Sequence, residues 1–133
     1  MIAVDASALV AILLGEPEAA RFASILESHD CAYVCPLSVY ETVAALVREL
    51  SCSVGDARMS VSDFFEESSI VIAPISLDDN ELALTAFDRY GKGRHPASLN
   101  MGDCYSYALA KAMRLPLLFK GNDFSQTDLD SAA

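Results

Sequence analysis

The sequence predicts an α/β fold in which a mainly parallel sheet lies between two layers of helices, a three-layer α/β/α sandwich. Short apolar segments with the character of buried strands alternate along the chain with longer segments of helical periodicity. No hairpin turn joins two strands, so each strand leads into a helical crossover, and such crossovers are right-handed and make the strands parallel. The 133 residues are 53% hydrophobic and contain no internal repeat or linker, which favours a single domain with a substantial core.

The expected strands and helices differ in length and in the spacing of their apolar residues. The strands are short apolar segments, expected at residues 2–4, 31–35, 70–75 and 116–119. The helices are longer, and most repeat apolar residues three and four positions apart; they are expected at residues 6–14, 17–28, 37–51, 56–67, 78–90 and 101–113. Between the last two helices, "GKGRHPASL" has the composition of a loop.

Residues that favour the ends of elements separate these segments. The sequence Gly-Glu-Pro ends the first helix, and Pro36 stops the second strand. Asp78 or Asp79 opens the fifth helix and Asn100 the sixth, because a short polar side chain at a helix start accepts hydrogen bonds from free backbone N–H groups. In open parallel sheets, binding sites lie beyond the carboxyl ends of the strands. We therefore expect functional residues directly after strands.

Composition excludes several classes of protein. The longest apolar run, "ALVAILL", is far shorter than the roughly 20 residues that span a bilayer. The N-terminus has no basic region and carries Asp5 where a signal peptide is apolar, so we expect a soluble cytoplasmic protein. The cysteines form no CxxC pair and only two histidines accompany them, which argues against a zinc site or a Cys/His nucleophile. Buried, reduced thiols are the better interpretation.

The charge of the chain is unevenly distributed. The net charge of −10 argues at first against a nucleic-acid partner. Residues 86–121, however, contain six basic and two acidic residues, a local charge of +4, whereas the rest of the chain carries −14. A basic face beside an acidic body is compatible with phosphate binding, and Lys92, Arg94 and Lys120 are candidate contacts. The other interpretation of each is an ordinary solvated side chain.

Two carboxylates stand out in the first half of the chain. Asp5 directly follows the first strand, where it could simply cap the next helix. Glu41 lies on an apolar helical segment, and none of its neighbours three and four residues away is a cation: Leu37, Ser38, Ala44 and Ala45. Burying an ionised glutamate without a partner is costly, so a buried Glu41 requires a metal ion or a proton.

Two further carboxylates follow in the second half. Asp103 is the third helical residue after Asn100, so the two form a variant of the capping box. Gly102, beside it, costs helix stability, and we predict that its bare backbone leaves room for metal, water and phosphate. Asp123, in "FKGNDF", has turn chemistry after the last strand.

If these four acids converge, their mutual repulsion raises their pKa values, and a divalent cation would relieve it. Oxygen ligands suit Mg²⁺ or Mn²⁺. A cluster of this kind is suited to hydrolysis of phosphodiesters, because the metal activates water and neutralises charge developing on the phosphate. Ser7, Asn100 and Asn122 lie beside the acids in sequence and are expected to orient carboxylates and waters.

Four segments carrying these residues resemble a known family. They are "VDASALVAILLGEPEA", "YETVAAL", "YGKGRHPASLNMGDCYSYALAK" and "PLLFKGNDFSQTDL", and together they resemble the PIN-domain ribonucleases that serve as VapC toxins of bacterial toxin–antitoxin pairs. The resemblance extends in order over nearly the whole chain and is weakest from residue 51 to 79.

The resemblance implies a PIN fold, endoribonuclease activity dependent on Mg²⁺ or Mn²⁺, inhibition by a VapB-type antitoxin, and a homodimer. It marks Asp5, Glu41 and Asp103 as the core acidic triad and Asp123 as the fourth acid. It also matches Ser7 and Asn100 to the polar positions that accompany these acids. Ala6 departs from the family pattern, in which Thr or Ser is frequent. Hydrolysis leaving a 5′-phosphate and a 3′-hydroxyl is likewise what the family implies.

Two other functions compete with this interpretation. One is a PIN fold without catalysis that acts through a protein partner, and it predicts no better Mn²⁺ binding than that of an Asp5→Asn variant. The other is a metal-dependent phosphatase of small phosphate esters. Neither predicts four acids within these flanking sequences. The apolar helical segments "SALVAILL" and "VYETVAALV" could bury surface in a homodimer, although apolar helices usually face a core.

Overall fold

The computed structural model describes residues 1–133 and contains a four-stranded parallel sheet with the strand order β3-β2-β1-β4. The strands are β1 (Ile2–Val4), β2 (Ala32–Val34), β3 (Ile70–Ile72) and β4 (Leu117–Leu118). The helices are α1 (Ala6–Leu13), α2 (Ala19–Glu27), α3 (Pro36–Leu50), α4 (Val54–Glu67), α5 (Leu77–Tyr90) and α6 (Met101–Met113), and the 3₁₀ helix η1 spans Phe124–Gln126. The predicted fold class is confirmed. None of the helices combines the length and the apolarity that crossing a membrane requires.

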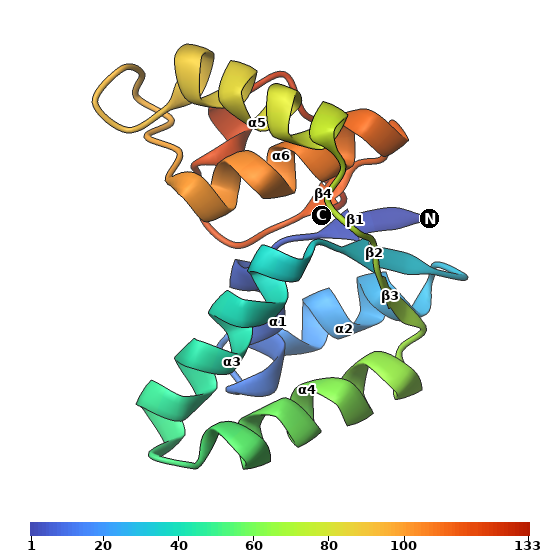
Figure 1. Ribbon diagram of the computed structural model, residues 1–133. Coiled ribbons are helices and arrows are strands. Elements are labelled where there is room, and N and C mark those ends of the chain that lie inside the picture. The colour runs from blue at the N-terminus through green and yellow to red at the C-terminus, as the bar shows by residue number, and fades with distance from the viewer.

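The helices cover the sheet from both faces. Figure 1 shows α5 and α6 on one side and α1, α2, α3 and α4 on the other. Because successive side chains of a strand point to opposite faces, Ile2 and Val4 enter the core under α1–α4, whereas Ala3 enters the core under α5 and α6. Each layer therefore has its own apolar core, and the short strands are buried between them.

The order of the strands identifies the edge where a site is expected. The chain moves from β1 outward to β2 and β3, and then returns to place β4 on the other side of β1. Ligand sites in open α/β sheets lie outside the carboxyl ends of strands at such a reversal. The segments that leave β1 and β4 meet there, since Asp5 N donates to the Leu118 carbonyl at 2.9 Å.

Most predicted elements have the expected position, with differences at their ends. Pro36 is the first residue of α3, a position where the missing N–H of proline costs nothing. The third strand ends at Ile72 rather than at residue 75, before Pro74. The prediction that Asp78 or Asp79 caps the fifth helix is wrong. Ser76 is the N-cap, and Asp79 completes a capping box with it.

Candidate active site

Asp5 lies at the carboxyl end of β1 and is almost fully buried, with 4% of its surface exposed. Its Oδ2 accepts a hydrogen bond from Ser7 N at 3.0 Å, so it does cap α1. The Ser7 hydroxyl turns the other way and accepts from Lys120 N at 3.0 Å, which joins the end of β1 to the segment after β4. Capping explains one carboxylate oxygen of Asp5 and leaves the other for a second partner.

Asp103 occupies the start of α6, where the predicted capping box is present. Asn100 Oδ1 accepts from Asp103 N at 2.9 Å, and Asp103 Oδ2 accepts from Asn100 N at 3.0 Å. Burial, together with the charges of Asp5, Asp123 and Glu41, raises the pKa of Asp103 from 3.8 to about 7, against the lowering effect of the Asn100 backbone hydrogen bond. The charges of all three other acids therefore act on the pKa of Asp103.

Glu41 projects from α3 toward the start of α6. Its carboxylate lies against Gly102, so closely that a Cβ built on this glycine would overlap both carboxylate oxygens. Burial, and secondarily the charge of Asp5, raise the pKa of Glu41, and no cation forms an ion pair with it. Gly102 therefore gives room first of all to Glu41. The prediction that this room serves metal, water and phosphate directly is corrected accordingly.

Asp123 lies after β4, at the start of η1, and is exposed. The segment that carries it is anchored to α6 through Asp128, which accepts from Tyr107 Oη and from Lys111 Nζ, both at 2.7 Å. Burial alone would raise the pKa of Asp128, but these two donors outweigh burial and lower it. The neighbouring Asn122 is exposed, and its side chain makes no hydrogen bond, so it is not drawn to the other polar groups.

Two buried serines that were not predicted as site residues contact this group of acids. Ser106 Oγ donates to Asp5 Oδ1 at 2.5 Å, and Ser38 Oγ lies 3.1 Å from Ser106 Oγ. Ser38 stands three residues before Glu41, and Ser106 three residues after Asp103. A hydroxyl one helical turn from an acid on an otherwise apolar helix is the signal that could have found both.

The three candidate phosphate contacts have different surroundings. Lys120 Nζ forms ion pairs with Glu16 at 2.8 Å and Glu18 at 3.4 Å, so its charge is already compensated. Arg94 lies 3.6 Å from Asp88 and over the ring of Phe87. Lys92 is exposed and makes no ion pair. Of the three, only Lys92 has no competing partner within the chain.

The donor set suits a hard divalent cation. Four carboxylates share one edge of the sheet with no cation among them, and burial together with repulsion raises the pKa values of Asp103 and Glu41. In their present rotamers the acids do not form a ready-made cluster of three or more metal ligands. A bound cation would offset the mutual repulsion of these carboxylates.

Comparison with known proteins identifies the family. The PIN-domain model matches residues 2–129. The ribonuclease VapC30 of Mycobacterium tuberculosis is 40% identical over 130 residues, an alignment that covers 98% of this chain and 97% of that protein. The chain belongs to the VapC ribonuclease family of PIN domains. A VapC ribonuclease of Rhizobium meliloti is 43% identical to this PIN domain over 138 residues, covering 95% and 97% of the two chains.

Solved structures share the fold of this PIN domain. The crystal structure of VapC20 from Mycobacterium tuberculosis, a toxin that cleaves the sarcin–ricin loop, aligns with a TM-score of 0.77 at 17% identity and covers 97% of this chain and 96% of that one. A toxin–antitoxin complex from Klebsiella pneumoniae aligns with a TM-score of 0.69 at 18% identity, with coverages of 96% and 93%. The resemblance read from the sequence is thereby confirmed at the level of family and fold.

Proposed function

We propose that this PIN domain is an endoribonuclease that hydrolyses RNA phosphodiester bonds with the help of Mg²⁺ or Mn²⁺. The observation that carries the proposal is the meeting of Asp5, Glu41 and Asp103 from three different elements, with the charge of Asp123 also reaching Asp103. Such an arrangement destabilises a protein unless it binds a cation. Membership in a family of ribonucleases supports RNA as the substrate.

The surroundings of each residue indicate its role in the proposed site. Asp5 and Asp103 would hold the principal metal, because each is fixed by backbone hydrogen bonds at one oxygen. Glu41 would bind it as well or hold its waters, and Asp123 would support a second, weaker metal or orient the attacking water. When bound, the cation supplies charge neutralisation at the phosphate and a more acidic water. Asn100 fixes Asp103 through the capping box, and Lys92 supplies a phosphate contact at the rim.

Cleavage of a folded RNA tests this function. We expect the wild-type chain to cut RNA only with Mg²⁺ or Mn²⁺ present, and Asp5→Asn and Asp103→Asn to lose most of that activity. Equal cleavage by all three chains would show that the site is wrong. Activity on a generic phosphomonoester with none on RNA would favour the phosphatase. No cleavage, together with equal Mn²⁺ binding by wild type and Asp5→Asn, would favour the interaction module.

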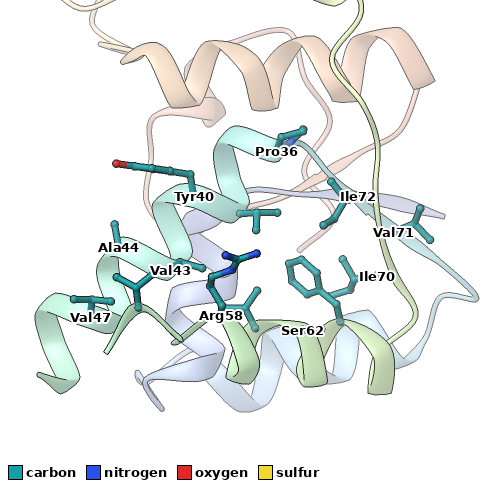
Figure 2. Close-up of a pocket in the computed structure, with 14 residues that line it drawn as sticks. Pro36, Tyr40, Val43, Ala44, Val47, Arg58, Ser62, Ile70, Val71 and Ile72 are labelled. Carbon is teal, nitrogen blue, oxygen red and sulfur yellow. The ribbon is translucent and has the colours of Figure 1, made fainter. Parts of the chain in front are cut away.

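A large apolar groove supports the further proposal that a VapB-type antitoxin is the partner. The groove has a volume of about 1090 Å³ and lies between α3, α4 and β3. Figure 2 shows side chains from these three elements lining it, among them Val43, Arg58 and Ile70. An apolar groove that is open to solvent is suited to bind an apolar segment of another protein.

Charge indicates what part of the antitoxin would fit. Arg58 is the one charged residue lining the groove, and it is exposed and forms no ion pair. We assign the groove to an amphipathic helix of the antitoxin whose apolar face packs between α3 and α4 and whose carboxylate meets Arg58. The groove shares α3 with Glu41, so an occupant also restrains the helix that carries this acid. The toxin–antitoxin complex among the structures of the same fold supports a partner of this kind.

The expected homodimer and the cytoplasmic location are also part of the proposal. The two helices expected to form the dimer surface differ in their exposure. The apolar side chains of α1 contribute to the core. Val39, Val43 and Val47 of α3 pack against that core as well, and they also line the groove. A second apolar surface is exposed on α5 at Leu84 and Phe87. We therefore assign the dimer contact to α5, which leaves the groove free for the antitoxin.

A further inference from the structure

A line of four buried polar groups connects the helices that carry the acids. Cys35 Sγ lies 3.3 Å from Ser38 Oγ, Ser38 Oγ lies 3.1 Å from Ser106 Oγ, and Ser106 Oγ lies 2.5 Å from Asp5 Oδ1. Both serines are completely buried, and Cys35 and Asp5 are exposed by only 3% and 4%. Water therefore has no access to the two serine hydroxyls, which have to form their hydrogen bonds with each other and with Cys35 and Asp5.

Counting protons gives this line a direction. Ser106 Oγ donates to Asp5 Oδ1, so its single hydroxyl proton is committed to that bond. Ser38 must then donate to Ser106, and its own proton is in turn committed. The Cys35 thiol is the remaining donor, and it points its proton at Ser38. The hydrogen bonds therefore all run the same way, from Cys35 through both serines to Asp5.

The line also joins the three elements that carry the core acids. Ser38 lies on α3 one turn before Glu41, and Ser106 lies on α6 one turn after Asp103. The hydrogen bond between the serines therefore fixes α3 against α6 close to both acids. Asp5, at the end of β1, receives the last hydrogen bond of the line. One set of small hydroxyl groups thus sets the relative positions of the three acids.

We propose that Ser106 and Ser38 are positioning residues for the metal site, with Cys35 as the terminal donor. This inference rests on the proposed function. Ser106 holds Asp5 Oδ1 and Ser7 N holds Oδ2, so each oxygen of Asp5 has one fixed donor and keeps its remaining lone pair for a cation. Loss of Ser106 frees the Asp5 carboxylate to rotate, and partners of this kind typically change metal affinity by about 10–100-fold.

Calorimetric titration of the full chain with Mn²⁺, without RNA, tests the proposal. We expect Ser106→Ala to weaken Mn²⁺ binding by about tenfold or more, and Ser38→Ala to weaken it less. The matched control is Thr42→Val, which removes another completely buried hydroxyl of α3, one that donates to the Ser38 carbonyl and lies outside the line. Its Mn²⁺ affinity is expected to equal that of the wild type.

Substitution of the cysteine gives a second test, which also serves if Ser106→Ala does not fold. Cys35→Ser keeps a donor for Ser38 and should bind Mn²⁺ as the wild type does, whereas Cys35→Ala should bind it more weakly. If Ser106→Ala folds and its Mn²⁺ affinity is unchanged, the proposal is overturned. If Ser106→Ala does not fold, equal Mn²⁺ affinities of Cys35→Ser and Cys35→Ala would overturn it. If the wild type binds no Mn²⁺, the proposed function fails and this inference fails with it.

Discussion

The carboxylate of Glu41 fills the space that a side chain at position 102 would occupy. The two residues come from different helices, α3 and α6, and the contact exists only because Gly102 has no Cβ. Glycine within a helix costs about 1 kcal/mol relative to alanine. The glycine is nevertheless required here, because it allows the Glu41 carboxylate to approach Asp5 and Asp103.

Substitution of this glycine should separate activity from stability. Gly102→Ala is expected to fold, because the overlapping atoms are the mobile end of the Glu41 side chain, which can rotate away. Its Mn²⁺ affinity and its RNA cleavage should fall together, by about tenfold or more. The matched control is Gly55→Ala in α4, where an added Cβ meets only Ser53 Oγ at 3.8 Å. That variant should keep full activity; a loss of activity in both variants would contradict the account.

The stability of the metal-free chain should fall as the pH rises from about 4 to about 7. Burial and neighbouring charges raise the pKa of Asp103 from 3.8 to about 7. Between these two pH values Asp103 is ionised in the unfolded chain but still protonated in the folded chain. The free energy of unfolding therefore falls by up to about 1.4 kcal/mol for each pH unit. Above about pH 7 both states are ionised and the contribution stays lost.

Urea unfolding at several pH values measures this dependence. In Asp103→Asn the free energy of unfolding should depend less on pH, because the amide of the asparagine does not titrate. Added Mn²⁺ should restore stability to the wild-type chain at neutral pH but not to Asp103→Asn, since a ligand stabilises the state that binds it. A variant with the same pH dependence as the wild type would mean that Asp103 is not the group that titrates.

Charge reversal in the groove should abolish antitoxin binding without affecting cleavage. Arg58→Glu places a second negative charge opposite the expected carboxylate, and Val43→Glu buries a charge in the apolar contact. In each variant, copurification with the cognate antitoxin should be lost while metal-dependent RNA cleavage persists. The control is Arg48→Glu, which reverses an exposed charge of α3 outside the groove. Retained antitoxin binding in both groove variants would place the partner elsewhere.

The sequence was sufficient to predict the sheet, its helical layers and the positions of the acids in the chain. Parallel strands follow from the alternation of short apolar and longer periodic segments, and residues after strands have to gather at one edge. The capping box of Asn100 and Asp103 was also predictable, because it depends on residues three apart. These are local patterns that the rest of the fold does not change.

The features that could not be predicted depend on contacts between distant segments. The neighbour of Gly102 is on another helix, and Ser106 meets Asp5 across 101 positions of sequence. Lys120 is a candidate phosphate contact from the sequence, and the fold brings Glu16 and Glu18 beside it, which its position in the chain did not indicate. The cap of α5 is a different case, because Ser76 and Asp79 form a capping box from residues only three apart, a local pattern that could have been recognised in the sequence.

The most direct test of the central claim compares two aspartates that have the same local role. Asp103 and Asp79 each complete a capping box at the start of a helix, but only Asp103 lies among the other acids. Mn²⁺-dependent cleavage of a folded RNA should be lost in Asp103→Asn and kept in Asp79→Asn. If both variants cleave RNA as the wild type does, Asp103 is only a helix cap and the acids do not form the active site.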